Sequence, residues 1–417
     1  MAIYYIDPLN GSDSASGLHP SAARRDYRTL TICPGDTVCF KRGCLIRAQL
    51  ETVAGEPDAP VTYTSYGSGP LPVFTTATDV SDLQDWEETA KNIWRCKKDI
   101  PGEVGNFIFD DDRCEATLCW EQEDLTQQGD FWDSRFGLCE NRSGAISSAQ
   151  ELLFYSVGNP AAYYRHIECA SHAGRRLCLV SDHNVLENLC FRGSGVHAVV
   201  GNGRDVVIRG CDFRNIGGCV FEKPIRVRFG NAIEFWIHAE DILVENCSFR
   251  NIYDSCVTHQ GPKNNTPPAQ NFNCRNNFFD TYSMAAFEYR DAVPIDSVFE
   301  HNLCRNAGCG FGMRGETLPR NSVIWPQPMG HHIFLWRMDR PTQGGNLRIT
   351  ENTFDGAIAG AHIYSIICPE AESQITLDKN KYLHSGPLFC RFGGEDFTTL
   401  TDFREKTGQE PHNAKHI

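Results

Sequence analysis

The sequence predicts an all-β fold, a parallel β-helix in which successive coils of chain stack into a solenoid. Three observations predict it: a short phrase that recurs, the β-branched runs that precede it, and the uneven spacing of its copies. The phrase is an Asn, Cys or Leu followed two residues later, in most copies, by an aromatic residue. Its copies are Leu189-Cys190-Phe191, Cys211-Asp212-Phe213, Cys247-Ser248-Phe249, Asn277-Phe278-Phe279, Asn302-Leu303-Cys304, Asn352-Thr353-Phe354 and Asn380-Lys381-Tyr382.

Successive copies are 22, 36, 30, 25, 50 and 28 residues apart. A solenoid allows such spacing because each coil restacks on the last one whatever loop is inserted between them. A β-propeller, the other all-β candidate, needs a regular period of about 40 to 50 residues. A β-branched run such as Val206-Val207-Ile208 precedes many copies, and a turn-like Arg-Asn, Asp-Gly or Arg-Gly pair often follows. The repeating unit is therefore a strand, a tight turn and another strand.

The repeat also predicts what fills the interior. Stacked coils place equivalent residues above one another, so one inward row of Asn and Cys and one of aromatic residues are expected along the axis. Cysteines such as Cys211 and Cys247 fall on the first row, where a free thiol acts as a small apolar side chain. The chain has 19 cysteines and no Cys-x-x-Cys pair, which favours buried thiols over a zinc site.

We expect one elongated domain over 1–417. It consists of an N-terminal cap and first coils (1–85), coils with large loop excursions (86–180), regular coils (181–392) and a C-terminal cap (393–417). The repeat is lost between about 85 and 175, so a subdomain packed on the side of the solenoid is the alternative there. The C-terminal cap includes a short helix around Leu400 to Lys406.

The net charge and the first residues of the sequence limit which partners and which location are expected. With 39 basic and 53 acidic residues the net charge is −14, which disfavours a nucleic-acid or anionic-membrane partner. No apolar signal region precedes the first strand at Met1-Ala2-Ile3, and a large cysteine load suits a reducing compartment. A cytoplasmic location is the expectation, or a secreted one if a signal was removed.

Several segments resemble a known superfamily. They are Tyr4-Tyr5-Ile6-Asp7-Pro8-Leu9-Asn10-Gly11-Ser12-Asp13, Tyr27-Arg28-Thr29-Leu30, the run from Pro34 to Gly43, Gln128-Gly129-Asp130-Phe131-Trp132, and the run from Tyr253 to Gln260. The chain resembles bacterial right-handed parallel β-helix proteins of the pectate-lyase-like superfamily. The resemblance implies a right-handed β-helix with long loops on one side and a carbohydrate-active enzyme, which leaves hydrolase, lyase, transferase and epimerase open.

Carboxylates are the main catalytic candidates, since glycoside cleavage needs one to protonate the leaving oxygen and another to activate water or attack carbon. Asp254 and Glu288 lead, with turn capping and an ion pair to Arg290 as their structural alternatives. Glu234 lies between Ile233 and Phe235, so strand alternation turns it away from the core. His259 is a candidate proton donor or a structural histidine.

Register adds Glu222 to this set. Counting nine residues past each aromatic leads to Glu222, Thr258 and Glu288 in successive coils. If the coils are in register, Glu222 and Glu288 lie two rungs apart, about 9 to 10 Å, near the upper end of the spacing in inverting glycosidases.

Aromatic planes with Arg, His and Gln donors are typical of sugar recognition. The candidates for substrate binding are Glu222, Trp236, Gln260, Arg290, Arg314, His331, His332, Trp336 and Arg337. The adjacent histidines would point to opposite sides of a strand, so no metal site and no cofactor is expected. The acidic run Asp110-Asp111-Asp112 is a candidate calcium site or a solvated turn.

The sequence favours a glycoside hydrolase that acts on a short oligosaccharide. A polysaccharide lyase or uronate epimerase that uses an Arg, His or Tyr as its base is the alternative, with Arg290, Arg314 and His259 as candidates, although lysines are scarce there. A transferase would use the same carboxylates as a hydrolase. A non-enzymatic glycan-binding solenoid is the third possibility, and the oligomeric state is left open.

Overall fold

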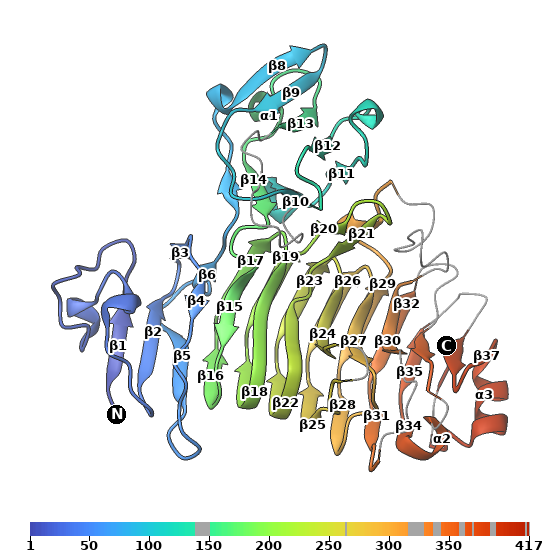
Figure 1. Ribbon diagram of the computed structural model, residues 1–417. Helices are drawn as coiled ribbons and strands as arrows, with labels where there is room; N and C mark the ends of the chain where they lie inside the picture. Colours follow the sequence, from blue (N-terminus) through green and yellow to red (C-terminus); the bar gives the residue numbers. More distant parts are fainter. Residues whose placement is uncertain are drawn as a thin grey trace.

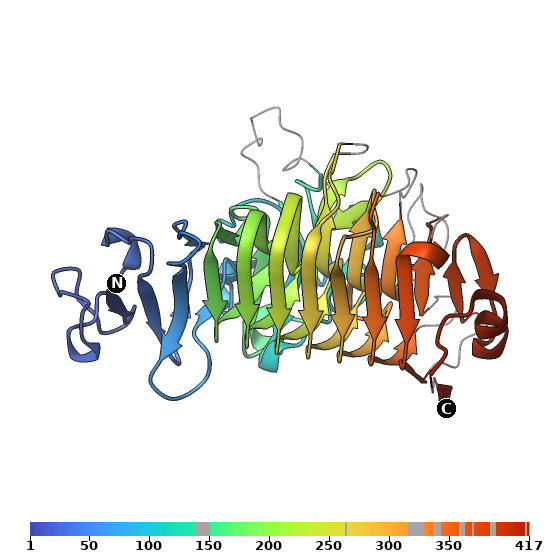
Figure 2. The same ribbon diagram turned by 90° about the horizontal axis from the view of Figure 1, so that it is seen from below.

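The structure is a computed structural model that describes residues 1–137, 151–262, 265–315, 329–336, 343–357, 363–368, 371–383, 389–412 and 415–416. Parallel strands stack into a solenoid that runs from β1 to β36 (Figure 1). Seen from below, the coils follow one another side by side between the two ends (Figure 2). The predicted all-β parallel β-helix is confirmed.

Each coil contributes a strand to three faces, which we call A, B and C in chain order. Face A consists of β4 (Leu50–Glu51), β15 (Arg176–Val180), the first halves of β18 (His197–Arg209) and β22 (Ile233–Glu245), β24 (Ser255–Gln260), β27 (Ala285–Arg290), β30 (His331–Trp336), β33 (Tyr364–Ile366) and β36 (Cys390–Phe392). Face B consists of β1 (Ile3–Ile6), β2 (Thr37–Lys41), β5 (Val61–Tyr66), β16 (Asn184–Glu187), the second halves of β18 and β22, β25 (Gln270–Arg275), β28 (Ser297–Glu300), β31 (Leu347–Thr350) and β34 (Ile375–Asp378). Face C consists of β3 (Leu45–Ile46), β6 (Val73–Phe74), β17 (Cys190–Ser194), β19 (Asp212–Ile216), β23 (Ser248–Ile252), β26 (Phe278–Tyr282), β29 (Leu303–Ala307), β32 (Thr353–Ala357), β35 (Lys381–Leu383) and β38 (Lys415–His416).

The recurring phrase sets the register of face C. Cys190 pairs with Asp212, Asp212 with Ser248, and Ser248 with Phe278, so the unequal sequence intervals become equal rungs. From β16 onward, the chain turns between faces B and C within two residues. The first has positive φ, as in Asn246 and Asn276, and Asn adopts this conformation more readily than most residues.

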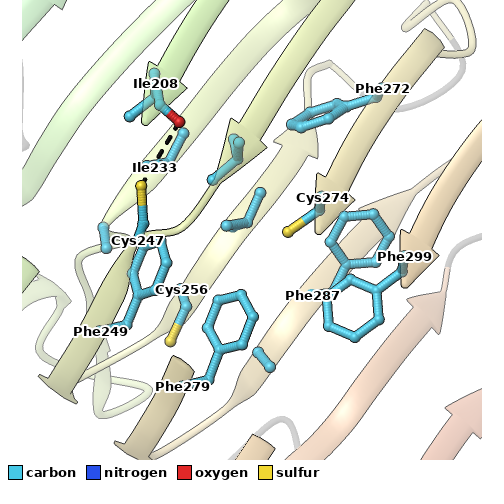
Figure 3. Close-up of a cluster of buried hydrophobic side chains, with 14 of the residues drawn as sticks. Ile208, Ile233, Cys247, Phe249, Cys256, Phe272, Cys274, Phe279, Phe287 and Phe299 are labelled. Atoms are coloured by element: carbon cyan, nitrogen blue, oxygen red, sulfur yellow. Dashed lines mark hydrogen bonds between the residues drawn. The ribbon is translucent and has the colours of Figure 1, made fainter. Parts of the chain in front are cut away.

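The predicted inward rows are both present. Asn277, Asn302, Asn352 and Asn380 form a ladder in which each Oδ1 accepts the backbone N–H of the equivalent residue one coil earlier, at 2.9 Å. The rings of Phe213, Phe249 and Phe279 stack with centroids 4.8 and 4.7 Å apart. Figure 3 shows the core around Phe249 and Phe279, where Phe287 of face A and Phe272 and Phe299 of face B also lie.

Residues 78–171, which we call the insert, leave the solenoid between β6 and β15. The insert holds β7 (Thr78–Asp79), β8 (Trp86–Ala90), β9 (Ile93–Cys96), β10 (Val104–Phe109), β11 (Thr117–Leu118), β12 (Asp130–Asp133), β13 (Leu152–Tyr155), β14 (Ile167–Ser171) and α1 (Pro160–Tyr163), with short 3-10 turns. Most of its strand pairs are antiparallel, and it has its own aromatic core around Phe107, Phe131 and Phe154.

The expectation of continuous coils over 86–180 therefore does not match this region, where coils resume only at β15. A physical reason is visible at β8 and β9, which a two-residue loop joins with Asn92 at positive φ. Such a tight loop makes an antiparallel hairpin, and a hairpin cannot stack as a coil. The insert rises from the solenoid above β17 and β19 (Figure 1).

The insert is held to face C by charged groups. Asp112, at the end of the 3-10 turn Asp110–Asp112, accepts hydrogen bonds from Arg192 and from Arg214, the latter at 2.6 Å. Glu168 of β14 accepts from Arg192 at 2.5 Å and from Arg47 at 2.7 Å. The acidic run is thus engaged in part with arginines of the solenoid.

A second excursion, the hairpin of β20 (Cys219–Glu222) and β21 (Val227–Phe229), lies at the same corner between faces C and A. At the C-terminal end, α3 (Leu400–Thr407) covers the last coil, where Phe403 packs on Phe389 and Phe392. This helix matches the short C-terminal helix that the sequence predicts.

Among the described residues, all 18 cysteines are free thiols and most are buried. Burial raises the pKa of several of these thiols, to about 11 for Cys39 and Cys96. No helix in the described part of the chain is long and apolar enough to cross a membrane.

Candidate active site on face A

Face A brings together most of the polar residues that the sequence singles out. Alternation along the strands turns every second side chain away from the core. The parallel register then aligns Glu234 of β22 with Thr258 of β24, and Thr258 with Glu288 of β27. Two residues further along, Trp236 pairs with Gln260, and Arg290 with Trp336.

Glu234 is held by three neighbours and is only 6% exposed. Its Oε2 accepts hydrogen bonds from Asn231 Nδ2 at 2.6 Å and from Gln260 Nε2 at 2.8 Å. The third neighbour is His197 of β18, whose Nδ1 lies 3.1 Å from the same oxygen. The carboxyl group is therefore fixed on the outside of the solenoid by residues of three successive coils.

A proton has to lie between His197 and Glu234. A nitrogen lone pair and a carboxylate lone pair would repel each other at this distance, so either the imidazole or the carboxyl carries hydrogen there. The backbone N–H of Asn231 also points at His197 Nδ1, at 3.1 Å, which favours the tautomer with an unprotonated Nδ1. The contact is therefore a hydrogen bond between His197 and Glu234, and it orients the Glu234 carboxyl group.

Glu288 is in a contrasting environment. It has no exposed surface, yet its Oε1 accepts from Arg290 Nε at 2.8 Å and from Trp336 Nε1 at 2.7 Å, and its Oε2 accepts from Ser255 Oγ at 2.6 Å. Burial alone would raise the pKa of Glu288, but the charge of Arg290 and these hydrogen bonds more than offset it and lower the pKa. Glu288 is therefore ionised at neutral pH.

The two carboxyl groups lie two rungs apart on the same face. Adjacent parallel strands are about 4.8 Å apart, which places the two backbones about 9.6 Å from each other. This is close to the upper end of the separation at which one carboxyl group protonates a leaving oxygen and the other activates water. The structure thus gives Glu234 the register position that the sequence assigned to Glu222.

Aromatic side chains flank the carboxyl groups. Trp236 is 40% exposed beside Glu234. On the other side of Glu288, the rings of Phe334 and Trp336 stack 5.4 Å apart, and the His331 ring lies 5.2 Å from Phe334. The guanidinium of Arg290 lies 4.7 Å from the centre of the Trp336 ring. Flat apolar rings next to hydrogen-bond donors provide both kinds of contact that a sugar ring offers.

Two predicted histidines point into the solenoid instead. His259 is 1% exposed, contacts Tyr289 in the core, and lies with Nε2 2.9 Å from the Ile237 carbonyl oxygen. Burial lowers its pKa to about 4, so it is neutral at pH 7. His332 is buried between Tyr282 and Phe354 and hydrogen-bonds the Tyr282 hydroxyl. In the aligned strands that place Thr258 and Glu288 outside, alternation turns His259 inward. At the start of β30 alternation is broken, because His332 and its neighbour Ile333 both face the core.

Glu222 is not on a rung. It ends β20 in the hairpin and is exposed, because the connection from β19 to β22 makes an excursion rather than another coil. It lines a hollow of about 570 Å³ at the hairpin tip with Glu121, Lys223 and Arg226. Counting a fixed number of residues past Phe213 fails wherever such an excursion intervenes.

The remaining candidates lie around face A. Asp254 is buried at the corner directly before β24, next to the Ser255 that binds Glu288. Arg314 is exposed after the 3-10 turn Phe311–Met313. Arg337 lies outside the described residues.

Sequence reasoning missed His197 and Asn231, which orient Glu234. A signal was available for Asn231, since it precedes Glu234 by three residues as Ser255 precedes Thr258. His197 gave none, because it stands alone before the apolar run Ala198-Val199-Val200. Across the part of the chain that the structure describes, no three His, Cys, Asp or Glu side chains gather as a metal ion would require.

No protein-family model matches the chain, and no curated protein matches its sequence. Solved structures do resemble its fold. XylC in complex with xylose has a TM-score of 0.58 and 11% identity over 92% of this chain and 62% of that chain. A glycoside hydrolase has a TM-score of 0.53 and 9% identity over 98% of this chain and 99% of that chain.

A lacto-N-biosidase of family GH136 from Eubacterium ramulus has a TM-score of 0.47 and 12% identity, over 91% of this chain and 56% of that chain. This chain thus spans less than two thirds of the XylC and lacto-N-biosidase chains. At such identities, the two structures with the higher TM-scores establish a shared fold, the parallel β-helix.

Proposed function

We propose that this protein is a glycoside hydrolase that cleaves a short oligosaccharide on face A, with Glu234 as the general acid. The observation that carries the proposal is a pair of carboxyl groups two rungs apart on face A, with Glu234 hydrogen-bonded to His197 and Glu288 ionised beside Arg290. Two carboxyl groups at about this spacing, one to protonate the leaving oxygen and one to activate water, are what acid and base catalysis on one bond requires.

Glu288 serves as the base in this proposal. Its Oε1 already accepts two hydrogen bonds, whereas Oε2 accepts one among the described residues, from Ser255. A carboxylate oxygen has two lone pairs, so Oε2 can accept a proton from a water molecule once the side chains that cover Glu288, which has no exposed surface in this structure, move aside. The separation of about two rungs leaves room for that water beside the sugar, which favours inversion of configuration.

The surroundings of the carboxyl groups suit a neutral or weakly charged sugar. Trp236 is 40% exposed and offers a ring face, and Arg290 offers N–H donors beside Glu288. Since Glu288 already neutralises Arg290, little positive charge is left to bind a strongly anionic polymer. The XylC structure contains xylose and another structure of the same fold is a glycoside hydrolase, which supports a carbohydrate substrate.

The test is hydrolysis of aryl glycosides and natural oligosaccharides by the purified protein. Reducing ends and the ultraviolet absorbance of an unsaturated product are followed together, because a lyase generates both. Glu234→Gln and Glu288→Gln are each expected to lower kcat by about 100-fold or more, while reducing ends form without absorbance in the wild type. Asp254→Asn is measured alongside, because it is the third carboxyl group beside the site.

Glu300→Gln is the matched control. Glu300 belongs to β28 on face B, so its neutralisation leaves face A intact and full activity is expected. Absorbance that persists in Glu234→Gln and Glu288→Gln would contradict the hydrolase and favour a lyase. A transferase would instead show as new oligosaccharides that are longer than the substrate. Binding without any turnover would favour a glycan-binding solenoid.

A further inference from the structure

The hairpin of β20 and β21 has two different sides. On one side Val220 is fully buried in the core of the insert, with Phe107 and Phe131. The other side carries Phe221 and Phe229, whose rings meet edge to face at 5.9 Å. The hairpin thus separates the insert from face A and turns an aromatic side away from the insert.

This aromatic side leads to the candidate acid in two contacts. The Phe229 ring lies 5.4 Å from the imidazole of His197, and His197 Nδ1 lies 3.1 Å from Glu234. Phe221 comes next after Phe229 and is 47% exposed. A solvent-exposed phenyl ring is therefore connected to the proposed acid through two ring contacts and one polar contact, on the N-terminal side of the site.

The hairpin is held firmly in this position. Arg228 of β21 is buried, and its Nε donates a hydrogen bond to the Gly218 carbonyl at 2.7 Å. It also donates to the Gly105 carbonyl of the insert at 2.9 Å, and its guanidinium covers the Tyr253 ring at 4.5 Å. At Gly105 itself, a Cβ would lie only 2.4 Å from the Cys219 nitrogen, so the insert and the hairpin are in direct backbone contact.

We propose that Phe221 and Phe229 form an apolar subsite that stacks on a pyranose ring of the substrate. This ring is next to the one whose glycosidic oxygen Glu234 protonates. This inference rests on the proposed function and deepens it: the substrate must extend past the cleaved bond toward the hairpin. The C–H face of a pyranose fits an aromatic plane, and a ring fixed before binding loses little entropy. An isolated exposed phenyl ring would be unremarkable, but this one is joined to the acid through Phe229 and His197.

The test compares wild type with Phe221→Ala on neutral oligosaccharides of cellulose, xylan and galactan, from disaccharide to hexasaccharide. Loss of one stacking ring is expected to raise KM about two- to tenfold for the longer members and to leave KM for a monosaccharide aryl glycoside unchanged. Phe221→Trp, which keeps a stacking plane, is expected to retain the wild-type KM. Tyr163→Ala is the matched control, because Tyr163 is an equally exposed aromatic residue on α1 of the insert.

Binding is measured separately, by titrating the same oligosaccharides into Glu234→Gln with and without Phe221→Ala. Weaker binding in the double variant supports the subsite whether or not the wild type hydrolyses the sugar. Hydrolysis that depends on Glu234 but has the same KM in Phe221→Ala for every chain length overturns the subsite and leaves the hydrolase standing. Binding that depends on Phe221 in a protein that does not hydrolyse the sugar supports the subsite and overturns the hydrolase.

Discussion

At the scale of single residues, partners decide whether a buried carboxyl group of this protein holds its proton. Glu288 is fully buried, yet Arg290 and the hydroxyl and indole donors lower its pKa. Glu103 of the insert is equally buried and accepts the backbone N–H groups of Val220 and Gly137 at 2.5 and 2.7 Å. There burial outweighs the two N–H donors and raises the pKa to about 8.

The raised pKa of Glu103 predicts a stability that depends on pH. The folded chain keeps this proton up to about pH 8, whereas the unfolded chain releases it near the ordinary value of 4.5. The contribution of Glu103 to the free energy of unfolding is therefore complete below about pH 4.5 and is lost as pH rises through about 8. Urea unfolding of wild type and Glu103→Gln across this range measures it.

Glu103→Gln cannot ionise at this position. Between pH 5 and 8 its free energy of unfolding is therefore expected to change by a few kcal/mol less than that of the wild type. The variant is expected to be less stable at the acidic end, because an amide nitrogen cannot accept the N–H that an oxygen accepts. The quantity to compare between the two proteins is the slope of the free energy of unfolding against pH. Equal slopes in the two proteins would show that Glu103 does not carry its proton in the folded state.

The scale of single residues also shows what the sequence can and cannot predict about the site. The position of Glu234 between Ile233 and Phe235 was enough to place it outside the core, since strand alternation is local. The same alternation, applied to the aligned strands of Glu288 and His259, would have placed Glu288 outside the solenoid and His259 inside it. His197 contacts Glu234 only because the register aligns β18 with β22, and nothing near His197 in the sequence reveals that.

At the scale of elements, the tight turn between faces B and C is the most regular part of the protein. Each ladder asparagine accepts a backbone N–H of the coil before it, and its Nδ2 donates to a carbonyl of that coil, as Asn277 does to Val244 at 3.0 Å. Cys247 occupies this position one coil earlier, and its Sγ lies 3.5 Å from the equivalent Ile208 carbonyl. The asparagine ladder therefore ends at Asn277, because Cys247 has no amide group with which to continue it.

Cys247→Asn is expected to extend the ladder by one coil. Its Oδ1 would accept the Cys211 N–H and its Nδ2 would donate to Ile208, while Cys247 N–H still donates to Asn277. Each net hydrogen bond stabilises a fold by about 1 kcal/mol, so the urea midpoint should rise. Cys247→Ala, which removes the side chain without adding an amide, should lower it. An asparagine variant less stable than the alanine variant would show that the coil there cannot accommodate the ladder.

Regular elements were the predictable part of the fold because the phrase that builds them repeats. Phe213, Phe249 and Phe279 stack as their spacing predicted, since each follows a two-residue turn that resets the register. The insert and the β20–β21 hairpin escaped prediction because each occurs once, so no second copy reveals its pairing. Glu222 was misplaced for this reason, since the hairpin separates it from the rung that Glu234 fills.

At the scale of the whole molecule, the excursions at the corner between faces C and A border the same region. The insert and the β20–β21 hairpin both leave the solenoid there, beside the first halves of β18 and β22, which carry His197 and Glu234 on face A. The two-residue turns between faces B and C leave no room for such loops. The scaffold thus has its regular turns along one edge and its excursions along another, beside the proposed site, which a solenoid permits because each coil contacts only its neighbours.

The same nearest-neighbour architecture predicts that damage at one end stays there. Phe403 of α3 is fully buried against Phe389, Phe392 and Phe397, at centroid distances of 5.7, 5.5 and 5.3 Å. Phe403→Ala removes a ring that covers the last coil, at a cost of about 3 to 5 kcal/mol. Amide hydrogen exchange is expected to accelerate in β36 and β33, while β18 and β22 keep their protection.

Leu83→Ala, at an exposed position in the insert, should leave the exchange of both groups of strands unchanged. If Phe403→Ala instead accelerates exchange in every coil alike, the solenoid unfolds as one cooperative unit, and loosening its end would reach the carboxyl groups on face A. Confined acceleration would mean that the rungs carrying Glu234 and Glu288 keep their register when the last coil opens. The spacing of the proposed acid and base would then depend on β22, β24 and β27 alone.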